Sequence, residues 1–547
     1  MDSERNAPLL EDPRSTTTGS ERQSGGSFGQ QAKPLKLVAV ISIVFFNVSG
    51  GPLGSEEIIS SLGPVIGLGL VLVFSLVFSI PQAMITAELS TAFPSNGGYS
   101  IWVQAAFGTF WGIQESYWSW FSGVVDSALY PVLLYSTGQQ LLSGMASGAH
   151  KTSISACNIT GAGGEDDDDD GSRMLWGCML DPGSGCALEY AVKLGTLALF
   201  CLPNAISSRV VGDFLAVLCL VAMLPFLVIA CLSLPQWRSA NFIRRPKHLD
   251  WATGVSTAYW NLSGFDSAST FAGEVEEPHK TFPRALFLSV AFIVTMYILP
   301  LFAGAGADPG WRCWTDGSLT SVALRVGGSW LGVWVVATSA LSTWGLFASE
   351  LLEDSFQLVG MAEMGLAPKL FATRNRFTGT PINCILLQFV IIGALVSLDF
   401  QQIMCVDNFF SAAAAALEFC ACIKLRYSQP QLERPYRIPL HRAALALALL
   451  LPITLSLYVC YATLVESRES MLVVCAGLGV GLLLYLPFLR ASRSEQMTVE
   501  NLSRAASSAT HNPVQGALLK RGGSARGSTS SSVSTRVSYS RAPPSAS

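Results

Sequence analysis

Long apolar stretches recur along this 547-residue chain, and they constrain its fold more than any other feature. A helix of about 20 apolar residues is long enough to cross the hydrocarbon core of a bilayer. The predicted spans are residues 37–62, 63–92, 110–143, 187–207, 210–234, 251–275, 283–304, 329–358, 382–398, 402–425, 441–464 and 470–489. Half of the residues are hydrophobic and only 13% are charged. The sequence therefore predicts an all-α polytopic membrane protein with twelve transmembrane helices.

The spans lie within residues 35–490, which we predict to form one transmembrane domain between two polar tails. Residues 1–34 are polar, and no apolar run precedes the first span, so we expect a disordered tail and no cleavable signal peptide. Residues 491–547 are rich in Ser and Arg and predict a second disordered tail. The net charge is −4 without a basic block, so nucleic acid binding is not indicated. No Cys and His spacing indicates zinc, and we expect no metal and no cofactor.

Lys and Arg residues are more numerous in the loops on the side of the amino terminus. The positive-inside rule therefore predicts cytoplasmic termini, and we expect the protein in the plasma membrane. The 144–186 loop then lies outside, and it carries Asn158 in an Asn-Ile-Thr glycosylation sequon. In the same loop Cys178 and Cys186 could pair with each other, or one could tether a partner, and spacing alone does not choose.

A polar, glycine-rich break interrupts the first span between Phe46 and Glu57. In lipid, unwound backbone survives only where it is buried in protein or lines a cavity, so the break predicts a binding site. The alternative is that the acids meet the dipole of the half-helix that follows, with a serine as its cap. Both roles are compatible, and two fixed carboxylates favour an amine ligand over a carboxylate. The candidate residues here are Gly50, Gly51, Gly54, Ser55, Glu56 and Glu57.

A second break, from Tyr259 to Ser267, interrupts the span 251–275 and contains Asn261 and Asp266. Two interrupted helices at corresponding places in two halves are typical of an inverted-repeat transporter with a midplane site. The alternative is that Gly and Ser only permit close helix packing. A Pro, two acids and an Asn with an Asp at these positions favour the transporter.

Ionisable residues inside the spans are almost all acidic, and such groups are by default functional or paired. Lys193 is the one base that we place in a span, so the positive charge is expected from a cationic substrate, from protons or from both. The acids are Glu56, Glu57, Glu88, Glu115, Asp126, Asp266, Glu274, Glu350, Glu353, Asp354, Asp407 and Glu418. Asp126, Asp266 and Glu350 lie mid-span without a basic neighbour on their own helices, and they are the favoured site residues.

The other acids have competing interpretations. The alternatives are a structural hydrogen-bonding role for Glu88, a place near an aqueous pathway for Glu353 and Asp354, and burial in protonated form for Asp407 and Glu418, while Glu115 receives no role. Trp260 lies six residues before Asp266 and is a candidate to stack on a cation, an interaction of about 2 kcal/mol when desolvated. A core Trp is the alternative.

Several motifs occur together in the order found in one group of transporters. They are Gly50–Glu57, Phe93–Tyr99, Ser122–Pro131, Trp260–Leu262 with Ala272–Glu276, and Asp354–Gln357. With these motifs the chain resembles the polyamine uptake transporters of the plant and protozoan branch of the amino acid–polyamine–organocation superfamily. The resemblance covers roughly residues 35–490. It implies a five-plus-five inverted repeat with broken helices 1 and 6, plus two additional helices, and proton-coupled polyamine uptake.

The chain is also similar to bacterial arginine/agmatine antiporters of the wider superfamily. That similarity implies an unwound turn at Gly50, Gly51, Gly54 and Ser55, a substrate-stacking aromatic at Trp260, and an acid of the second half-helix at Asp266. Relatives that bind amino acids have a Gly-Ser-Gly turn that holds the carboxylate, and Glu56 replaces its last glycine here. This departure argues against an α-amino acid substrate. An alignment anchored on Met364–Pro368 implies that Glu350 faces the site.

We therefore predict a secondary transporter that imports putrescine, spermidine or spermine by proton-coupled alternating access. Its partners would be the small cationic substrate, protons and membrane lipid. Sodium coupling through Ser339, Ser342 or Thr343 is the competing possibility. The alternative functions are a cationic amino acid transporter or exchanger, and a polyamine or amino acid sensor that moves little of its ligand.

Overall fold

The structure is a computed structural model that describes residues 36–94, 97–146, 185–206, 208–363, 366–375, 378–398, 400–466, 468 and 470–486. Within these ranges the regular elements are helices, and no β-strand occurs. The predicted tails, the sequon at Asn158 and the side chains of Cys178 and Cys186 lie outside the described part of the chain.

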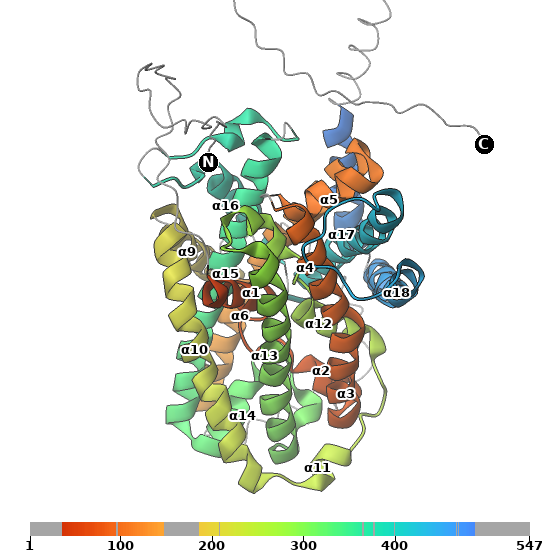
Figure 1. Cartoon of the computed structure of the whole chain (residues 1–547). Coiled ribbons are helices and arrows are strands. Elements are labelled where there is room, and N and C mark those ends of the chain that lie inside the picture. Colours follow the sequence, from red (N-terminus) through yellow and green to blue (C-terminus); the bar gives the residue numbers. More distant parts are fainter. Residues whose placement is uncertain are drawn as a thin grey trace, which may run out of the picture.

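The helices follow the predicted apolar stretches (Figure 1). They are α1 (Leu37–Val48), α2 (Glu57–Leu62), α3 (Pro64–Phe74), η1 (Ser75–Ser79), α4 (Ile80–Ala92), α5 (Gly98–Phe107), α6 (Thr109–Ala146), α9 (Gly185–Ile206), α10 (Ser208–Ser233), η2 (Leu234–Gln236), α11 (Ser239–Ile243), α12 (Trp251–Leu262), η3 (Ser267–Glu274), α13 (Pro278–Ala307), η4 (Trp311–Cys313), α14 (Ser318–Gly327), α15 (Ser329–Glu363), η5 (Lys369–Ala372), α16 (Ile382–Leu395), α17 (Phe400–Ser428), α18 (Arg442–Glu466) and a helix at Ser470–Leu486.

Six helical stretches of the described chain are long and apolar enough to cross a membrane. They are Pro64–Ala92, Val217–Gln236, Pro278–Ala307, Ser329–Glu363, Phe400–Ser428 and Arg442–Val465. Three shorter apolar helices accompany them, at Leu37–Val48, Ile382–Leu395 and Ser470–Leu486. The chain is therefore a polytopic helical membrane protein.

Both predicted helix breaks are present, although each is shorter than the sequence suggested. The first comprises residues 49–56 between α1 and α2, because Phe46 and Asn47 still belong to the last turn of α1. The second comprises residues 263–266 between α12 and η3, since the helix continues through Leu262. At this second break the chain turns at Gly264, whose φ of +95° is rarely adopted by residues with a Cβ.

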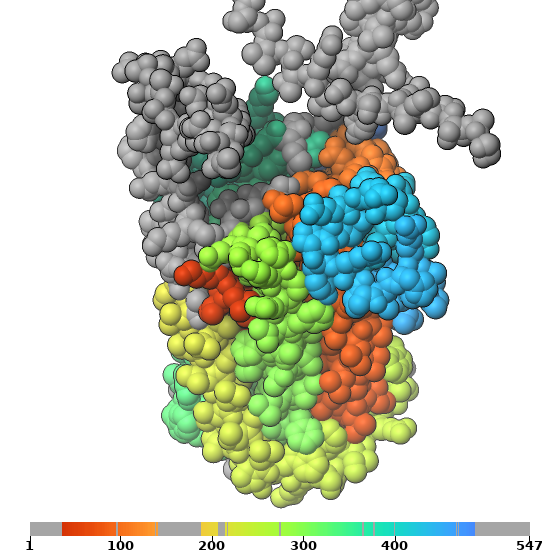
Figure 2. Space-filling model, viewed as in Figure 1, coloured from red at the N-terminus to blue at the C-terminus, as the bar shows by residue number. Residues whose placement is uncertain are grey.

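One face of the molecule is covered by α3, α10 and α13, which lie side by side in Figure 2. Their outward side chains are large and apolar. Examples are Leu72 on α3, Leu76 on the η1 segment that follows it, Val217 and Leu220 on α10, and Leu288 on α13, all of which are exposed. An apolar surface of this extent is expected where a protein contacts the hydrocarbon of a bilayer.

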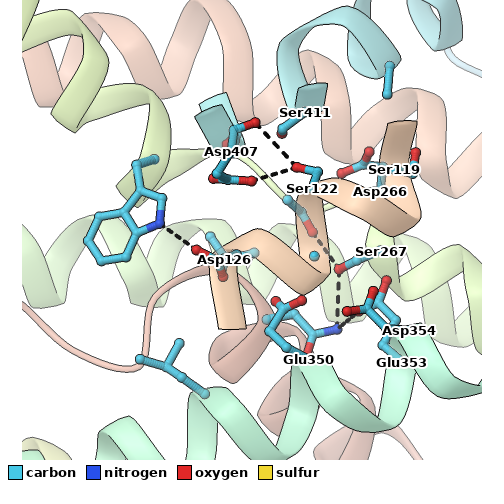
Figure 3. A pocket seen from close by; sticks show the side chains of 18 of the residues that line it. Ser119, Ser122, Asp126, Asp266, Ser267, Glu350, Glu353, Asp354, Asp407 and Ser411 are labelled. Atoms are coloured by element: carbon cyan, nitrogen blue, oxygen red, sulfur yellow. Dashed lines mark hydrogen bonds between the residues drawn. The ribbon is translucent and has the colours of Figure 1, made fainter. Parts of the chain in front are cut away.

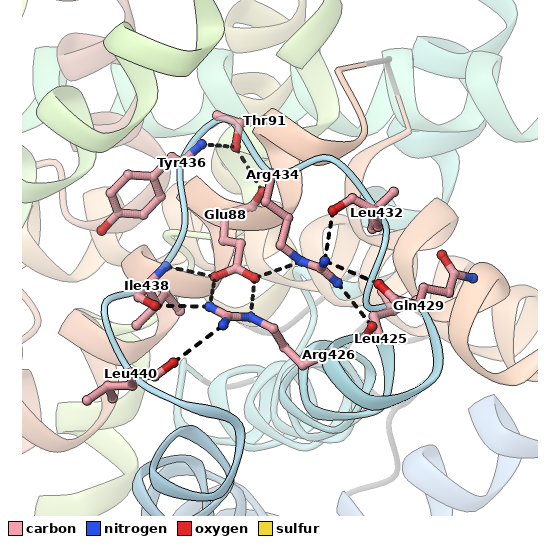
Figure 4. Close-up of polar contacts among 10 residues, drawn as sticks. All are labelled: Glu88, Thr91, Leu425, Arg426, Gln429, Leu432, Arg434, Tyr436, Ile438 and Leu440. Atoms are coloured by element: carbon pink, nitrogen blue, oxygen red, sulfur yellow. Dashed lines mark hydrogen bonds and ion pairs between the residues drawn. The ribbon is translucent and has the colours of Figure 1, made fainter.

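A buried ion-pair cluster fastens α4 to the end of α17 and to the loop that leads to α18. Figure 4 shows the Glu88 carboxylate between the guanidinium groups of Arg426 and Arg434. Arg426 Nε donates to Glu88 Oε1 at 2.6 Å, and the Ile438 amide donates to Oε2 at 2.9 Å. The expectation that the intramembrane acids lack basic partners is therefore wrong for Glu88. Arg426 lies just past the predicted span 402–425, so the sequence alone did not place it inside the protein.

The described cysteines lie outside the 144–186 loop, for which the sequence left the pairing of Cys178 and Cys186 open. Cys313 in η4 is disulfide-bonded. Nine other cysteines of the described chain, including the buried Cys201 and Cys422, form no disulfide.

Candidate substrate-binding site

A cavity of about 90 Å³ lies at the centre of the helix bundle, where the two breaks meet. Its wall comes from the end of α1, from α6, from the α12–η3 break, and from α15 and α17. These segments are far apart in the sequence, and Figure 3 shows their polar side chains pointing into a common space. Unwound backbone at membrane depth must be buried in protein or line a cavity, and the helix breaks line this one.

The cavity wall is strongly acidic. Six of the described lining residues are acids: Asp126, Asp266, Glu350, Glu353, Asp354 and Asp407. The other described lining residues include Ser, Asn, Tyr and Trp, but no Lys, Arg or His. Carboxylates that face one another without a cation repel, so this arrangement favours a ligand that brings positive charge or protons.

Asp126 is fixed by donors from two helices. The Trp260 indole Nε1–H donates to Asp126 Oδ1 at 2.7 Å, and the Tyr130 hydroxyl donates to Oδ2. Tyr130 lies one turn further along α6, so it meets Asp126 on the same helical face. Because both donors are neutral, the negative charge of Asp126 is oriented toward the cavity but not neutralised.

Asp266 is held by Gln82 of α4, a residue that the sequence analysis did not assign. Gln82 Nε2 donates to Asp266 Oδ1 at 2.8 Å, while Gln82 Oε1 accepts from the amides of Gly264 at 3.2 Å and Phe265 at 3.4 Å. One buried amide side chain therefore satisfies the unwound backbone and positions the acid next to it. Such pairing is required, because a buried amide without a partner is costly.

Glu350, Glu353 and Asp354 of α15 share one helical face because their spacing is i, i+3 and i+4. Glu353 Oε2 accepts from Asn47 Nδ2 at 2.5 Å, which ties α15 to the last turn of α1. Asp354 lies against Gly123 of α6, where an added Cβ would lie only 2.3 Å from Asp354 Oδ1. Glu350 is 7% exposed and accepts no hydrogen bond from any side chain or amide of the described chain. A buried carboxylate of this kind needs a bound cation or a proton.

Asp407 of α17 completes the wall. Its Oδ1 accepts from Ser122 of α6 at 2.5 Å. Figure 3 shows this pair opposite Glu350 and Glu353. The sequence analysis considered Asp407 as a buried protonated group, and the structure places it at the cavity, 6% exposed.

The predicted site residues divide into three groups. Asp126, Trp260, Asn261, Asp266 and Glu350 line the central cavity. Gly50 and Gly51 line a separate cavity of about 10 Å³, together with Ser339, Ser342 and Thr343. Gly54, Ser55, Glu56 and Glu57 line neither cavity. The small cavity lies where the sequence analysis placed a competing sodium site.

The Glu56 carboxylate accepts hydrogen bonds from two backbone amides. Glu56 is fully buried, and its carboxylate accepts from the Gly54 amide at 2.7 Å and from the Leu319 amide of α14 at 3.2 Å. The geometry therefore does not support the predicted contact between Glu56 and a substrate amine. Local spacing could not show this, because Leu319 lies far away in the sequence.

Gly54 and Asn261 hold the two breaks together. Asn261 Nδ2 donates to the Gly54 carbonyl at 3.1 Å. At Gly54 an added Cβ would lie 2.6 Å from the Trp260 ring, and its φ of +85° also requires glycine. The predicted unwound turn is thus the surface against which Trp260 packs.

Glu353, Asp354 and Asp407 are cavity residues that sequence reasoning recorded as intramembrane acids without assigning them to the site. The i, i+3, i+4 spacing from Glu350 was the available signal for the first two. Gln82 and Asn47 gave no signal, since their roles depend on contacts between distant segments.

The matched family and the relatives agree with this architecture. Residues 35–480 match the family model described as amino acid permease, and the chain belongs to that family, whose members are transporters rather than enzymes. It is 38% identical to Polyamine transporter PUT1 of Oryza sativa subsp. japonica, over 79% of this chain and 74% of the rice protein. It is 36% identical to Polyamine transporter RMV1 of Arabidopsis thaliana, over 77% of this chain and 79% of RMV1. It is 37% identical to Probable polyamine transporter At3g19553 of the same plant, over 84% of this chain and 88% of that relative.

Proposed function

We propose that this protein imports polyamines by proton-coupled alternating access. The observation that carries the proposal is the central cavity, whose described wall holds six acids and no base. Putrescine, spermidine and spermine carry several ammonium groups at neutral pH, because alkyl amines have pKa values near that of Lys, about 10.4. Several amines along one flexible chain match several separated carboxylates. The relatives named polyamine transporters support the same substrate class.

Asp126, Asp266, Glu350, Glu353, Asp354 and Asp407 are the proposed ammonium ligands. At one or both carboxylate oxygens, Glu350 and Asp354 accept no hydrogen bond from the described chain. These two carboxylates are therefore the most available to bind an ammonium group. Trp260 would cover the methylene chain, and its Nε1–H keeps Asp126 in place. Binding of a cation here would supply the charge that the buried acids lack.

The unwound turn of the first break disfavours an α-amino acid. Its Gly54 amide donates to Glu56, and its Gly51 amide donates to Ser49 Oγ at 3.2 Å. These amides are therefore engaged by the protein itself and are not free to hold a substrate carboxylate. Glu56 thus supports a polyamine by blocking carboxylate capture, and not by touching the amine.

The proposed architecture has twelve spans arranged as a five-plus-five inverted repeat with two additional helices. The α1–α2 and α12–η3 segments would be broken helices 1 and 6, about which the bundle rocks between outward and inward states. The termini are proposed to be cytoplasmic, because the Lys and Arg distribution favours that orientation. The proposed location is the plasma membrane.

Uptake of radiolabelled putrescine and arginine by the full chain, expressed in cells that lack both activities, tests this proposal. We expect saturable putrescine uptake that rises with external acidity and does not require sodium. The Glu350→Gln variant should raise the KM for putrescine, whereas Glu363→Gln, on the exposed end of the same helix, should not. Uptake of arginine without putrescine would overturn the substrate class, and strict sodium dependence would point to the small cavity beside Ser342.

A further inference from the structure

Three carboxyl groups meet beside the central cavity, from three different segments. Asp266 immediately precedes η3 and lines the cavity. Glu115 of α6 and Glu418 of α17 do not line it, and both side chains are fully buried. Ser119, which Figure 3 shows near Asp266, donates to Glu115 Oε1 at 2.9 Å. The three acids therefore form a second carboxyl cluster whose one contact with the cavity is Asp266.

Glu418 has no donor from the described chain. No amide or hydroxyl there reaches either of its carboxyl oxygens, and Glu115 Oε2 is likewise without a donor. The group that faces Glu418 is the Asp266 carboxyl, and the two carboxyl groups are close enough to form a hydrogen bond. An ionised carboxylate has no hydrogen to donate. Two carboxyl groups can form such a bond only when one of them carries a proton.

No described base balances this cluster. The basic residues further along α17 are engaged elsewhere, since Lys424 lies over the Phe107 ring at 4.4 Å and Arg426 binds Glu88. The groups that act on Glu418 electrostatically are Asp266 and Glu115. Tyr99 of α5, Tyr259 of α12 and Cys460 of α18 bring no positive charge to the cluster, Glu88 of α4 is already paired, and Asp126 of α6 is a further acid. A proton is therefore the positive charge that the cluster holds.

We propose that Asp266 and Glu418 share one proton, and that this pair with Glu115 is a proton-binding site that shares Asp266 with the proposed substrate ligands. The inference rests on the proposed transport function and names the residues that couple it to protons. An ammonium group beside Asp266 favours its ionised form. The O–H bond of Asp266 is then lost and one forms on Glu418, so substrate and proton are held at the same time by neighbouring groups.

The place of the cluster gives the transfer a direction. Glu115 lies six residues into α6, about 9 Å from its start, and Glu418 lies ten residues before the end of α17, about 15 Å away. Both helix ends belong to the side of the molecule where α5 packs against α6 and α17 (Figure 1). The positive-inside pattern assigns that side to the cytoplasm. The cluster therefore lies between the cavity and the compartment that receives the proton.

The test compares two activities of the full chain in liposomes. One is putrescine accumulation driven by a pH gradient, and the other is putrescine exchange at equal pH on both sides. Glu418→Gln mimics the protonated side chain, so we expect accumulation to fall to the level seen without a gradient, and exchange to fall by a much smaller factor. Glu363→Gln, an exposed glutamate of α15, should keep both activities. Gradient-driven accumulation by Glu418→Gln that equals the wild type would overturn the proposal.

A second measurement does not depend on transport. Infrared spectra of the purified protein at neutral pH should contain the C=O band of a buried protonated carboxyl group, and this band should be absent in Glu418→Gln. An unchanged band would overturn the proton site even if transport is confirmed. Should Glu418→Gln fail to fold, Glu418→Asp is expected to shift the band, and an unshifted band would again contradict the proposal. Absence of putrescine transport by the wild type would instead contradict the proposed function.

Discussion

The indole of Trp260 donates a 2.7 Å hydrogen bond to the carboxylate of Asp126, which links the end of α12 to the middle of α6 across the cavity. The bond joins two residues that the sequence marked separately, one as a stacking aromatic and the other as a mid-span acid. It also fixes the plane of the indole ring, whose edge packs against Gly54. Trp260 therefore does more than offer a face for a cation, because it also orients an acid of the site.

Removing this donor should weaken substrate binding. Trp260→Phe keeps an aromatic ring but leaves Asp126 with Tyr130 alone. Hydrogen bonds to charged groups contribute about 1.5–3 kcal/mol, so we expect the KM for putrescine to rise about tenfold or more. Uptake kinetics in expressing cells give this value. Trp330→Phe, at a 58% exposed position of α15, is the matched control and should behave as the wild type. A wild-type KM in Trp260→Phe would contradict the role of the bond.

Gln82 should be required for stability as well as for the site. Gln82→Leu leaves the amides of Gly264 and Phe265 without a partner, and each unsatisfied buried group costs about 1–3 kcal/mol. It also removes the donor to Asp266. We expect a lower melting temperature in detergent together with reduced putrescine uptake. Gln139→Leu, at an exposed position of α6, should change neither quantity. Equal melting temperatures for the two variants would argue against this role.

Gly123 should be intolerant of a methyl group. In Gly123→Ala the new Cβ would lie 2.3 Å from Asp354 Oδ1, so the acid or the helix must shift. Overpacking of this kind costs about 1–3 kcal/mol and would displace a cavity acid. We expect a higher KM for putrescine from uptake measurements. Gly138→Ala on the same helix meets no atom within 4 Å and should be neutral. The prediction fails if both alanine variants transport alike.

The cluster around Glu88 should determine stability more than transport. Arg426→Met leaves Glu88 buried with only Arg434 as its basic partner, and breaking a buried ion pair costs about 3–5 kcal/mol. We expect a large fall in melting temperature. The double variant Glu88→Gln with Arg426→Met should recover part of it, because the Glu88 charge is then removed together with Arg426, and Arg434 keeps its hydrogen bonds to the carbonyls of Gln429, Leu432 and Leu425. Arg374→Met removes the exposed pair with Glu363 and should cost no more than about 1 kcal/mol. No recovery in the double variant would contradict this account.

The sequence anticipated the helices and their interruptions well, because these depend on local patterns. Apolar length predicts a membrane helix. A run rich in Gly and Pro, such as Gly50 to Gly54, interrupts that helix, and unwound backbone at membrane depth must be buried in protein or line a cavity. The acids were equally visible, since an ionisable residue in an apolar stretch is conspicuous wherever it lies. Their grouping was not visible, except on α15, where helical spacing alone places Glu350, Glu353 and Asp354 together.

Glu56 shows why the remainder required the tertiary structure. Its position after the unwound turn suggested a substrate contact, but α14 brings the Leu319 amide to it from a distant part of the chain. The same holds for Gln82 with Asp266, for Asp407 with Ser122 and for Glu418 with Asp266. Sequence by itself determined that this is a helical membrane protein with two broken helices and an excess of buried acids. Only the packing of distant helices decided which acids share the cavity, which carboxylate accepts hydrogen bonds from backbone amides, and which carboxyl groups face one another, because partners in space are not specified by local spacing.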